Sequence, residues 1–284
     1  MLSYRHAFHA GNHADVLKHW VLTLILEALC RKDKPFFVLD THAGAGRYDL
    51  HASRSQKTLE FQRGIGRLWG KMSEIPSLAA YAEVLGAMPG QGSLRWYPGS
   101  PWIIRHFLRA GDRLVLSELH PEDVRVLSQW LEGDSRVRIE ASDGYEVLKA
   151  CVPPRERRGL IHIDPAFERK DEISRLLLAL SEAHRRWASG SFAVWYPIQG
   201  ARSFEEIPRG VRRLGIPKTL QIEYELGCED PQGLKGSGMI LINPPYLLKE
   251  TLSQDLPKVL SAMAQGSPPR FKVEWLVPEA PLSS

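Results

Sequence analysis

The sequence predicts an open α/β fold built on a mostly parallel sheet. Short apolar runs typical of buried strands alternate with stretches of helical period along most of the 284 residues. The first run lies within residues 34–46, ends in Asp40 and passes directly into a loop that contains Gly44 and Gly46. A glycine loop at the carboxyl end of a strand lets the backbone come close to a nucleotide-type ligand.

Composition and charge are those of a globular protein that tolerates a polyanionic partner. Apolar residues make up 43% and charged residues 25% of the chain, and the formal net charge is +4. Three widely spaced cysteines favour neither a disulfide framework nor a cysteine metal site. The N-terminus is polar and no apolar run approaches the roughly 18 residues of a membrane span. We therefore expect a cytoplasmic protein without a membrane anchor.

The N-terminal region predicts a helix over residues 13–29. Asn12 is a suitable N-cap, and Asp15 follows three residues later as in a capping box. His6, His9 and other histidines cluster here, but without a carboxylate or cysteine at ligand spacing. This pattern predicts a polar segment at the rim of a binding site, in contact with substrate or cofactor, rather than a metal site.

An insertion separates the glycine loop from the second strand, residues 113–120. In a simple dinucleotide unit the acid that ends this strand lies about 20 residues past the loop, whereas Glu118 comes much later. The intervening helix is expected at residues 101–109, with Ser100 as its N-cap and Pro101 at its first position. We therefore expect a main domain over residues 1–47 and 98–284, with an inserted helical subdomain over residues 48–97.

The rest of the chain continues the alternation and completes a predicted seven-stranded sheet. Helices are expected at residues 124–131, 147–151 and 172–187, and strands at 137–139, 160–163, 192–198, 220–226 and 238–242, with a short strand at 272–277 in the tail. The link over residues 227–236 is too short for a crossover helix, so the pair that it joins should be antiparallel.

The expected strand ends carry polar residues that suit an adenosine-bearing cofactor. Glu118 at the end of the second strand suits the two hydroxyls of a ribose. Asp143, next to Gly144, suits an adenine amino group. Because the carboxyl ends of parallel strands converge on one crevice, these residues should meet there.

Asp164-Pro165-Ala166-Phe167 follows the fourth strand, an order found in class I S-adenosylmethionine-dependent methyltransferases. Asp164 and the main-chain oxygen of Pro165 could accept the two hydrogens of an exocyclic amino group and so localise its lone pair for attack on a methyl group. Phe167 offers a face on which an extruded base stacks. This chemistry requires no metal.

A second motif, Asn243-Pro244-Pro245-Tyr246, is a fuller form of the same pattern. It follows a late strand of the predicted antiparallel pair, so chain order favours Asp164 and Pro165 as the catalytic motif. The second motif is interpreted as a rigid strand exit that could still lie near the substrate.

Long stretches of the chain resemble the bacterial 23S rRNA adenine-N6 methyltransferase J (RlmJ) family. They include M-L-S-Y-R-H-x-F-H-A-G-N-H-A-D-V-L-K-H, L-D-T-H-A-G-A-G-R-Y, Y-P-G-S-P, E-L-H, R-R-G-L-I-x-I-D-P, W-Y-P and S-G-M-I-x-I-N-P-P. The resemblance covers almost the whole chain. It implies a Rossmann-like methyltransferase fold with a helical insert, the cofactor S-adenosyl-L-methionine (product S-adenosyl-L-homocysteine), and 23S rRNA as substrate.

The resemblance also implies roles for individual residues. Asp164 would be the catalytic acceptor and would also line the cofactor site with His19, His42, Ser100, Glu118, Asp143 and Gly144. Tyr4, His6 and Lys18 would belong to a tail that closes over cofactor and RNA. The family usually has Pro-Tyr where this chain has Ala166-Phe167, which puts the rate and the choice of base in question.

Other functions remain open at this point. A DNA adenine or cytosine amino methyltransferase would share the Asp-Pro-x-aromatic motif. A non-catalytic RNA-binding module that retains the fold is motivated by Ala166-Phe167. A nicotinamide-dependent dehydrogenase is disfavoured, because the loop lacks the spacing of the dinucleotide fingerprint. We expect a monomer, since no apolar dimer stripe is visible.

Overall fold

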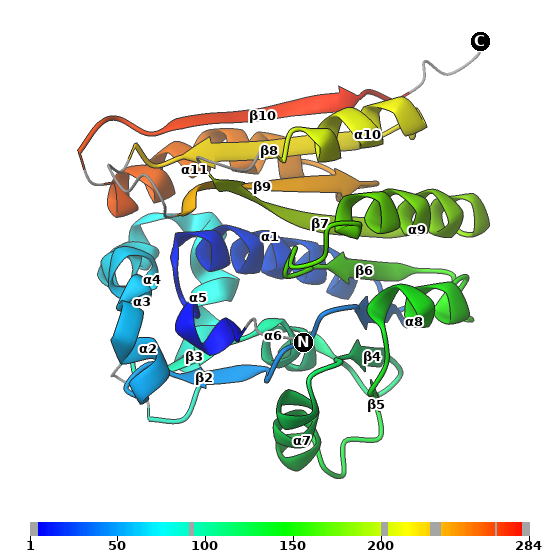
Figure 1. Cartoon of the computed structure of the whole chain (residues 1–284), viewed down its shortest axis with the longest axis horizontal. Helices are drawn as coiled ribbons and strands as arrows, with labels where there is room; N and C mark the ends of the chain where they lie inside the picture. The colour runs from blue at the N-terminus through cyan, green and yellow to red at the C-terminus, as the bar shows by residue number, and fades with distance from the viewer. Residues whose placement is uncertain (1–4, 91–93, 200–203, 228–233, 265, 280–284) are drawn as a thin grey trace.

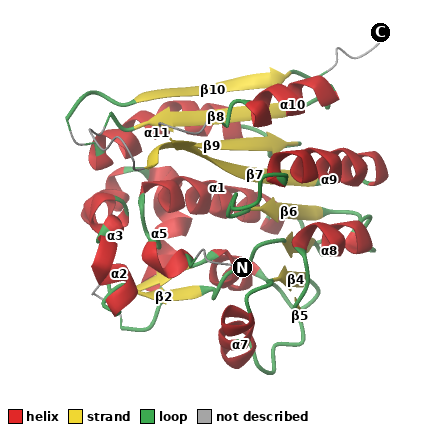
Figure 2. Cartoon of the chain, viewed as in Figure 1, coloured by secondary structure: helices red, strands yellow, loops and turns green. Residues whose placement is uncertain are grey.

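An eight-stranded sheet forms the middle of three layers, with helices on both of its faces (Figure 1). The computed structural model describes residues 5–90, 94–199, 204–227, 234–264 and 266–279. Colouring by secondary structure shows strands through the middle and helices outside them (Figure 2). The predicted α/β class is confirmed.

The strand order is β10-β8-β9-β7-β6-β1-β4-β5. The strands of this sheet are β1 (Phe37–Asp40), β4 (Arg113–Ser117), β5 (Val137–Glu140), β6 (Gly159–Ile163), β7 (Ser191–Gln199), β8 (Thr219–Glu225), β9 (Leu234–Ile242) and β10 (Arg270–Val277). The five strands β5, β4, β1, β6 and β7, which are neighbours in this order, pair in parallel. In contrast, β9 is antiparallel to both β7 and β8. The predicted seven strands and their antiparallel late pair are confirmed, and β10 adds an eighth strand at the edge next to β8.

Two apolar clusters hold the helices against the two faces of the sheet. One cluster includes side chains of α1 (His13–Cys30), α6 (Ser100–Phe107), α7 (Pro121–Trp130) and α11 (Leu248–Met263). The other includes side chains of α8 (Gly144–Cys151), α9 (Glu172–Arg186) and α10 (Glu206–Leu214). Because neighbouring side chains of a strand point to opposite faces, each central strand contributes to both clusters.

The helix α1 confirms the expected N-terminal helix and is buried almost all round. Every residue from 13 to 23 is buried, because the sheet covers one side of the helix and the segment after β1 covers another. The Asn12 side chain accepts hydrogen bonds from Ala14 N and Asp15 N, as an N-cap does. Asp15 reaches back to Gly11 N at 2.8 Å, one residue before the cap.

The segment between β1 and α6 is mainly helical, as expected. It contains α2 (Ser53–Thr58), α3 (Glu60–Arg63), α4 (Ile65–Leu68), α5 (Ala79–Gly86) and the 3-10 helices η2 (Trp69–Glu74) and η3 (Pro76–Leu78). It is framed by a strand pair that the sequence analysis did not anticipate, β2 (Arg47–Asp49) and β3 (Trp96–Pro98). Its apolar side chains join the cluster around α1. Its status as a separate subdomain stays a prediction.

Two smaller features complete the described chain. A 3-10 helix, η1 (His6–Phe8), precedes α1. The N-cap of α6 is Gly99, so Ser100 lies inside the helix, one residue from its expected place. No helix in the described ranges is long and apolar enough to cross a membrane.

Candidate active site

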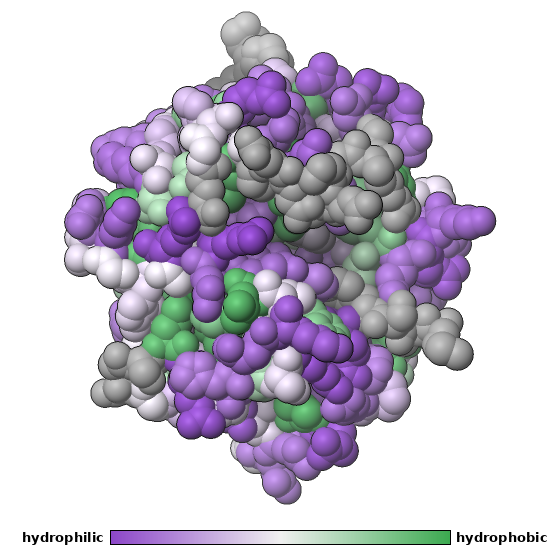
Figure 3. All heavy atoms as spheres, turned by 60° about the vertical axis from the view of Figure 1, so that its left-hand side comes forward, coloured by the Kyte–Doolittle hydropathy of each residue, from purple (hydrophilic) through white to green (hydrophobic). Residues whose placement is uncertain are grey.

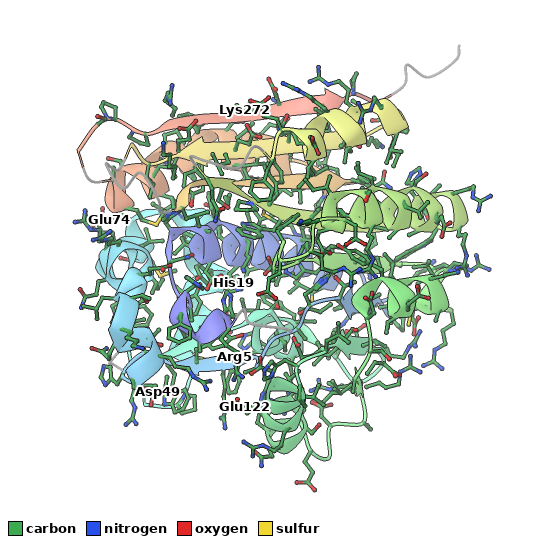
Figure 4. The ribbon with its side chains drawn as sticks, in the orientation of Figure 1. Arg5, His19, Asp49, Glu74, Glu122 and Lys272 are labelled. Carbon is green, nitrogen blue, oxygen red and sulfur yellow. The ribbon has the colours of Figure 1, made fainter. Side chains whose placement is uncertain are left out.

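A cleft of about 130 Å³ opens at the carboxyl ends of β1, β4, β5 and β6, beside the middle of β7. Most residues predicted for the site line it, as do others that were not predicted. The predicted ones are His6, Lys18, His19, His42, Gly44, Ser100, Glu118, Gly144, Asp164 and Pro165. His19, labelled in Figure 4, points from α1 toward this region. Gly46, Asp143 and Phe167 are not among the lining residues, and Tyr4 lies outside the described residues.

Asp164 lies in the wall of the cleft directly after β6. Ile163 is in register with Val194 of the parallel strand β7, so the next residues, Asp164 and Trp195, emerge side by side. Lys18 Nζ donates to Asp164 Oδ2 at 2.5 Å and lies 5.3 Å from the centroid of the Trp195 ring. Burial favours the neutral acid, but the Lys18 ammonium outweighs it and lowers the pKa of Asp164. The acid is therefore ionised at neutral pH.

Asp15 joins the N-terminal region to this acid, a role that the sequence analysis missed. Its side chain is 1% exposed and contacts Lys18 Nζ at 2.8 Å and His6 Nε2 at 2.9 Å. Burial opposes its charge, but His6 and Lys18 prevail and hold the pKa of Asp15 well below its usual range. Lys18 thus lies between two carboxylates. The sequence signal was the spacing of Asp15 and Lys18 on one helix face.

The glycine loop is tied to the end of β4 through Glu118. Gly44 N donates to Glu118 Oε2 at 2.7 Å, and His120 N donates to Oε1 at 2.7 Å. Burial raises the pKa of Glu118. The two main-chain donors hold the carboxylate against the cleft, where it can accept further hydrogen bonds from a diol.

Glycine is required in this loop for packing as well as for conformation. Gly44 and Gly46 have φ values of +61° and +78°. A Cβ on Gly44 would lie 2.4 Å from the Tyr48 hydroxyl, and one on Gly46 would lie 2.5 Å from the Trp130 ring. Gly46 therefore faces α7 rather than the cleft, although its φ shapes the loop that borders it.

Asp143 has structural partners for both of its carboxylate oxygens. It caps α8 by accepting from Tyr145 N at 3.0 Å, and Arg175 Nη2 donates to its other oxygen at 2.7 Å. Its neighbours Ser142 and Gly144 line the cleft. The adenine contact predicted for Asp143 stays a prediction, and forming it would require the carboxylate to share one of these partners.

Phe167 does not offer the stacking face that the sequence analysis assigned to it. The residue is 4% exposed, and its ring packs against Phe204 at 5.1 Å and Trp195 at 6.2 Å between centroids. Its φ of +53° turns the chain so that the ring enters the core. Trp195 is the aromatic residue that lines the cleft near Asp164. The available signal was an aromatic residue in the middle of the strand beside the fourth.

The second motif lies at the opposite edge of the sheet. Ile242 at the end of β9 is in register with Phe192 at the start of β7, because these strands are antiparallel. Asn243 therefore lies beside the amino ends of the parallel strands, where its side chain donates to Ala188 O and Gly190 O. Tyr246 is 89% exposed. The motif therefore does not line the cleft, its interpretation as a strand exit holds, and a place near the RNA substrate stays a prediction.

Two histidines of the cleft wall, His19 and His42, are neutral at pH 7. Burial lowers the pKa of His19 to about 3 and that of His42 to about 4. His19 Nδ1 is 2.8 Å from the Tyr97 hydroxyl, which in turn lies 2.7 Å from that of Tyr81. These residues join α1 to β3 and α5 by polar contacts beneath the cleft.

Two buried polar side chains beneath Asp164 have unsatisfied atoms. Asp40 and His162 are register partners on the neighbouring strands β1 and β6. One carboxylate oxygen of Asp40 and both ring nitrogens of His162 have no hydrogen-bond partner. Burial raises the pKa of Asp40 to about 7 and lowers that of His162 to about 4, so His162 is neutral at pH 7. No group of three or more metal-ligating side chains occurs within the described ranges.

Comparisons with known proteins agree with this architecture. A family model described as "Ribosomal RNA large subunit methyltransferase D, RlmJ" matches residues 33–277. "Ribosomal RNA large subunit methyltransferase J" of Escherichia coli (strain K12) is 46% identical over 281 residues, which is 98% of this chain and 100% of that protein. The protein of the same name from Haemophilus influenzae (strain ATCC 51907 / DSM 11121 / KW20 / Rd) is 43% identical over the same shares.

A solved structure shows the same fold. The crystal structure of a protein from Legionella pneumophila str. Philadelphia 1 is 35% identical, with a TM-score of 0.87, and the match covers 94% of this chain and 98% of that one. The family match spans far more than half of the chain, and the relatives align along almost all of it. The chain is a methyltransferase and belongs to the RlmJ family.

Proposed function

We propose that this protein transfers a methyl group from S-adenosyl-L-methionine to the N6 amino group of one adenosine in 23S rRNA. The single observation that carries the proposal is the position of Asp164, an ionised carboxylate in the wall of the cleft beside an aromatic ring. The relatives are named as ribosomal RNA large subunit methyltransferases, which supports RNA over DNA as the substrate. We further propose that the enzyme works in the cytoplasm.

The residues of the cleft fit the proposed cofactor. Glu118 is held by two main-chain donors and has remaining lone pairs for ribose hydroxyls. The loop from Thr41 to Gly44 lines this space together with Ser142 and Gly144, and the two glycines leave it free of side chains at their positions. When bound, S-adenosyl-L-methionine supplies an electrophilic methyl group.

The chain's own residues would orient and activate the amino nitrogen. Adenine N6 shares its lone pair with the ring, so acceptors for its two hydrogens make it a better nucleophile. We propose Asp164 and the Pro165 carbonyl as those acceptors. Trp195, in place of Phe167, would provide the face on which the extruded base stacks.

Lys18 has a specific part in this proposal. Its ammonium contacts Asp164 Oδ2, one of the two oxygens of the carboxylate that we propose as an acceptor for the amino group. It therefore keeps the acid ionised while no base is bound, and Asp15 offers it a second carboxylate when the base arrives. His6 contacts the same Asp15, so we propose that the N-terminal segment responds to entry of the base.

A methyl-transfer assay on 23S rRNA tests the proposal. Large-subunit rRNA from a strain without its own homologue would be incubated with labelled S-adenosyl-L-methionine, digested to nucleosides and analysed by mass spectrometry. We expect N6-methyladenosine at one site. A matched DNA oligonucleotide serves as the comparison, and methylation of DNA alone, or of a different base, would refute the proposal. RNA binding without turnover would instead favour a non-catalytic module.

A further inference from the structure

A second hollow, of about 180 Å³, lies next to the cleft. Its walls come from η1, the β2 strand, α2 and α7. His6, Tyr48 and Asp123 line both the cleft and this hollow, so the two spaces are neighbours across those side chains. In Figure 4, Arg5, Asp49 and Glu122 mark three of the elements around it.

Three arginines line the hollow, and they differ in how firmly they are paired. Arg5 contacts Glu122 at 2.7 Å and Asp123 at 3.4 Å, so its charge is satisfied within the protein. Arg54 reaches Glu122 only at 3.7 Å, and its side chain is 42% exposed. Arg47 has no acidic partner among the residues that the structure describes. Its guanidinium lies 5.5 Å from the centroid of the Trp96 ring.

The acidic residues of the hollow do not cancel these two arginines. Asp49 pairs with Arg95 at 3.2 Å, whereas Glu122 and Asp123 pair with Arg5 at shorter distances than Glu122 does with Arg54. Arg47 and Arg54 therefore keep guanidinium donors for a ligand. The side of the molecule that carries β2 and α2 is mostly hydrophilic, with scattered apolar patches (Figure 3).

We propose that the hollow binds backbone phosphates of the nucleotides that flank the target adenosine, with Arg47 and Arg54 as the contacts. The inference rests on the proposed function and extends it. A base that leaves its stack to reach Asp164 brings its own strand to the mouth of the cleft. The flanking phosphates must then run over adjacent surface, and a guanidinium fork matches phosphate geometry. Stacking on Trp96 holds the Arg47 fork in place before RNA arrives.

The test is RNA binding over a series of salt concentrations by Arg47→Ala and Arg54→Ala. A fluorescent single-stranded RNA that contains the target adenosine is titrated, and affinity is plotted against salt on logarithmic axes. Each variant should bind about tenfold more weakly at low salt. Each should also lose about 0.7 to 1 from the salt slope, which corresponds to one phosphate contact. S-adenosyl-L-homocysteine affinity, measured by calorimetry, should stay at the wild-type value.

Arg270→Ala is the matched control. Arg270 lies on β10 at the far edge of the sheet, its side chain is 82% exposed, and its removal changes the net charge equally. It should leave the salt slope unchanged. Arg47→Lys keeps the charge but loses the fork, so it should retain the slope and bind more weakly than wild type.

The outcomes separate this inference from the proposed function. Slopes for Arg47→Ala and Arg54→Ala equal to that of Arg270→Ala, in an enzyme that methylates 23S rRNA, would overturn the hollow as a phosphate site and leave the function intact. If either variant lost as much affinity for S-adenosyl-L-homocysteine as for RNA, the hollow would belong to the cofactor site, and this would also overturn the inference. If Arg47→Ala lowered the salt slope of RNA binding but the wild-type protein did not methylate 23S rRNA, the proposed function alone would be refuted.

Discussion

At the scale of single residues, the contact between Lys18 and Asp164 is the most informative feature of the cleft. The Lys18 ammonium lies 2.5 Å from Asp164 and also contacts Asp15. Together the three side chains form a buried group of one positive and two negative charges. Removal of one member of such a group leaves an uncompensated charge. Substitutions here therefore need variants that separate the loss of chemistry from the loss of structure.

Replacement of Asp164 should abolish activity and retain cofactor binding. We expect Asp164→Ala to lower the rate of methyl transfer by at least about 10²-fold, since one preorganised acceptor of the transition state is lost. Lys18 keeps Asp15 as its partner in this variant. The rate is measured with labelled cofactor, and S-adenosyl-L-homocysteine affinity by calorimetry. Asp164→Asn preserves the shape and controls for packing, and near-normal turnover of Asp164→Ala would contradict the role.

Trp195 should matter more for RNA than for cofactor. Stacking of a base on an aromatic ring contributes about 1–3 kcal/mol, so Trp195→Ala should raise KM for RNA about tenfold or more. Trp195→Phe keeps a ring but loses the hydrogen bond from Nε1 to Ser237 Oγ, and it should stay close to wild type. Steady-state kinetics with RNA as the varied substrate measures both. Equal KM values for Trp195→Ala and wild type would remove Trp195 from the base pocket.

At the scale of elements, close contact between α8 and the glycine loop fixes the cleft. A Cβ on Gly144 would lie 2.1 Å from the Thr41 carbonyl oxygen, which no side chain could accommodate without a shift of the backbone. Gly144 therefore allows the first turn of α8 to pack against the residue that follows β1. This packing explains the glycine without reference to adenine, and the two explanations are compatible.

Gly144→Ala should destabilise the protein and weaken cofactor binding. Overpacking of this kind costs about 1–3 kcal/mol, and the shift would widen the gap between α8 and the loop. Urea unfolding gives the free energy, and calorimetry gives the affinity for S-adenosyl-L-homocysteine. Gly86→Ala in α5 is the control, because its new Cβ would meet nothing within 4 Å. If the two variants unfolded at the same urea concentration, the close contact between Gly144 and Thr41 would not determine the stability of the protein.

The sequence predicted elements and strand ends well, and side-chain directions less well. Asp164, Glu118 and the glycine loop follow apolar strands, so their meeting at one edge follows from parallel pairing. The direction of Phe167 depends on its positive φ and on partners from β7 and the region of Phe204, none of which a local motif specifies. The β2 and β3 strands are three residues each and carry little periodic signal.

At the scale of the whole molecule, buried histidines link stability to pH. His19, His42 and His162 have folded-state pKa values of about 3, 4 and 4 because burial disfavours their charged forms. In the unfolded chain they return to about 6.5. A histidine with a lowered pKa in the folded state contributes its full stability at pH values above its pKa in the unfolded chain. That stability is lost as the pH falls from about 6.5 toward 4.

The free energy of unfolding should therefore fall between pH 6.5 and pH 5. Asp40 and Glu118 act in the opposite sense, because burial raises the pKa of both carboxyls, that of Asp40 to about 7, and so favours the folded state at low pH, but these two groups do not cancel three histidines. Urea unfolding at intervals of half a pH unit measures the slope. His162→Phe should reduce it, whereas substitution of the exposed His51 should not. A flat profile in the wild type would contradict the neutral state of these histidines.

The position of α1 has a consequence for synthesis of the protein. His13 at the start of α1 is bonded to the Tyr224 hydroxyl at 2.7 Å and to Leu234 O at 3.0 Å, residues that come more than 200 positions later. The helix that carries Lys18 is thus among the first segments to leave the ribosome, yet its packing is completed only after β9 has been made. A nascent chain that has not yet reached β9 lacks these two contacts of the helix that carries Lys18, so full catalytic competence should arise only near the end of translation.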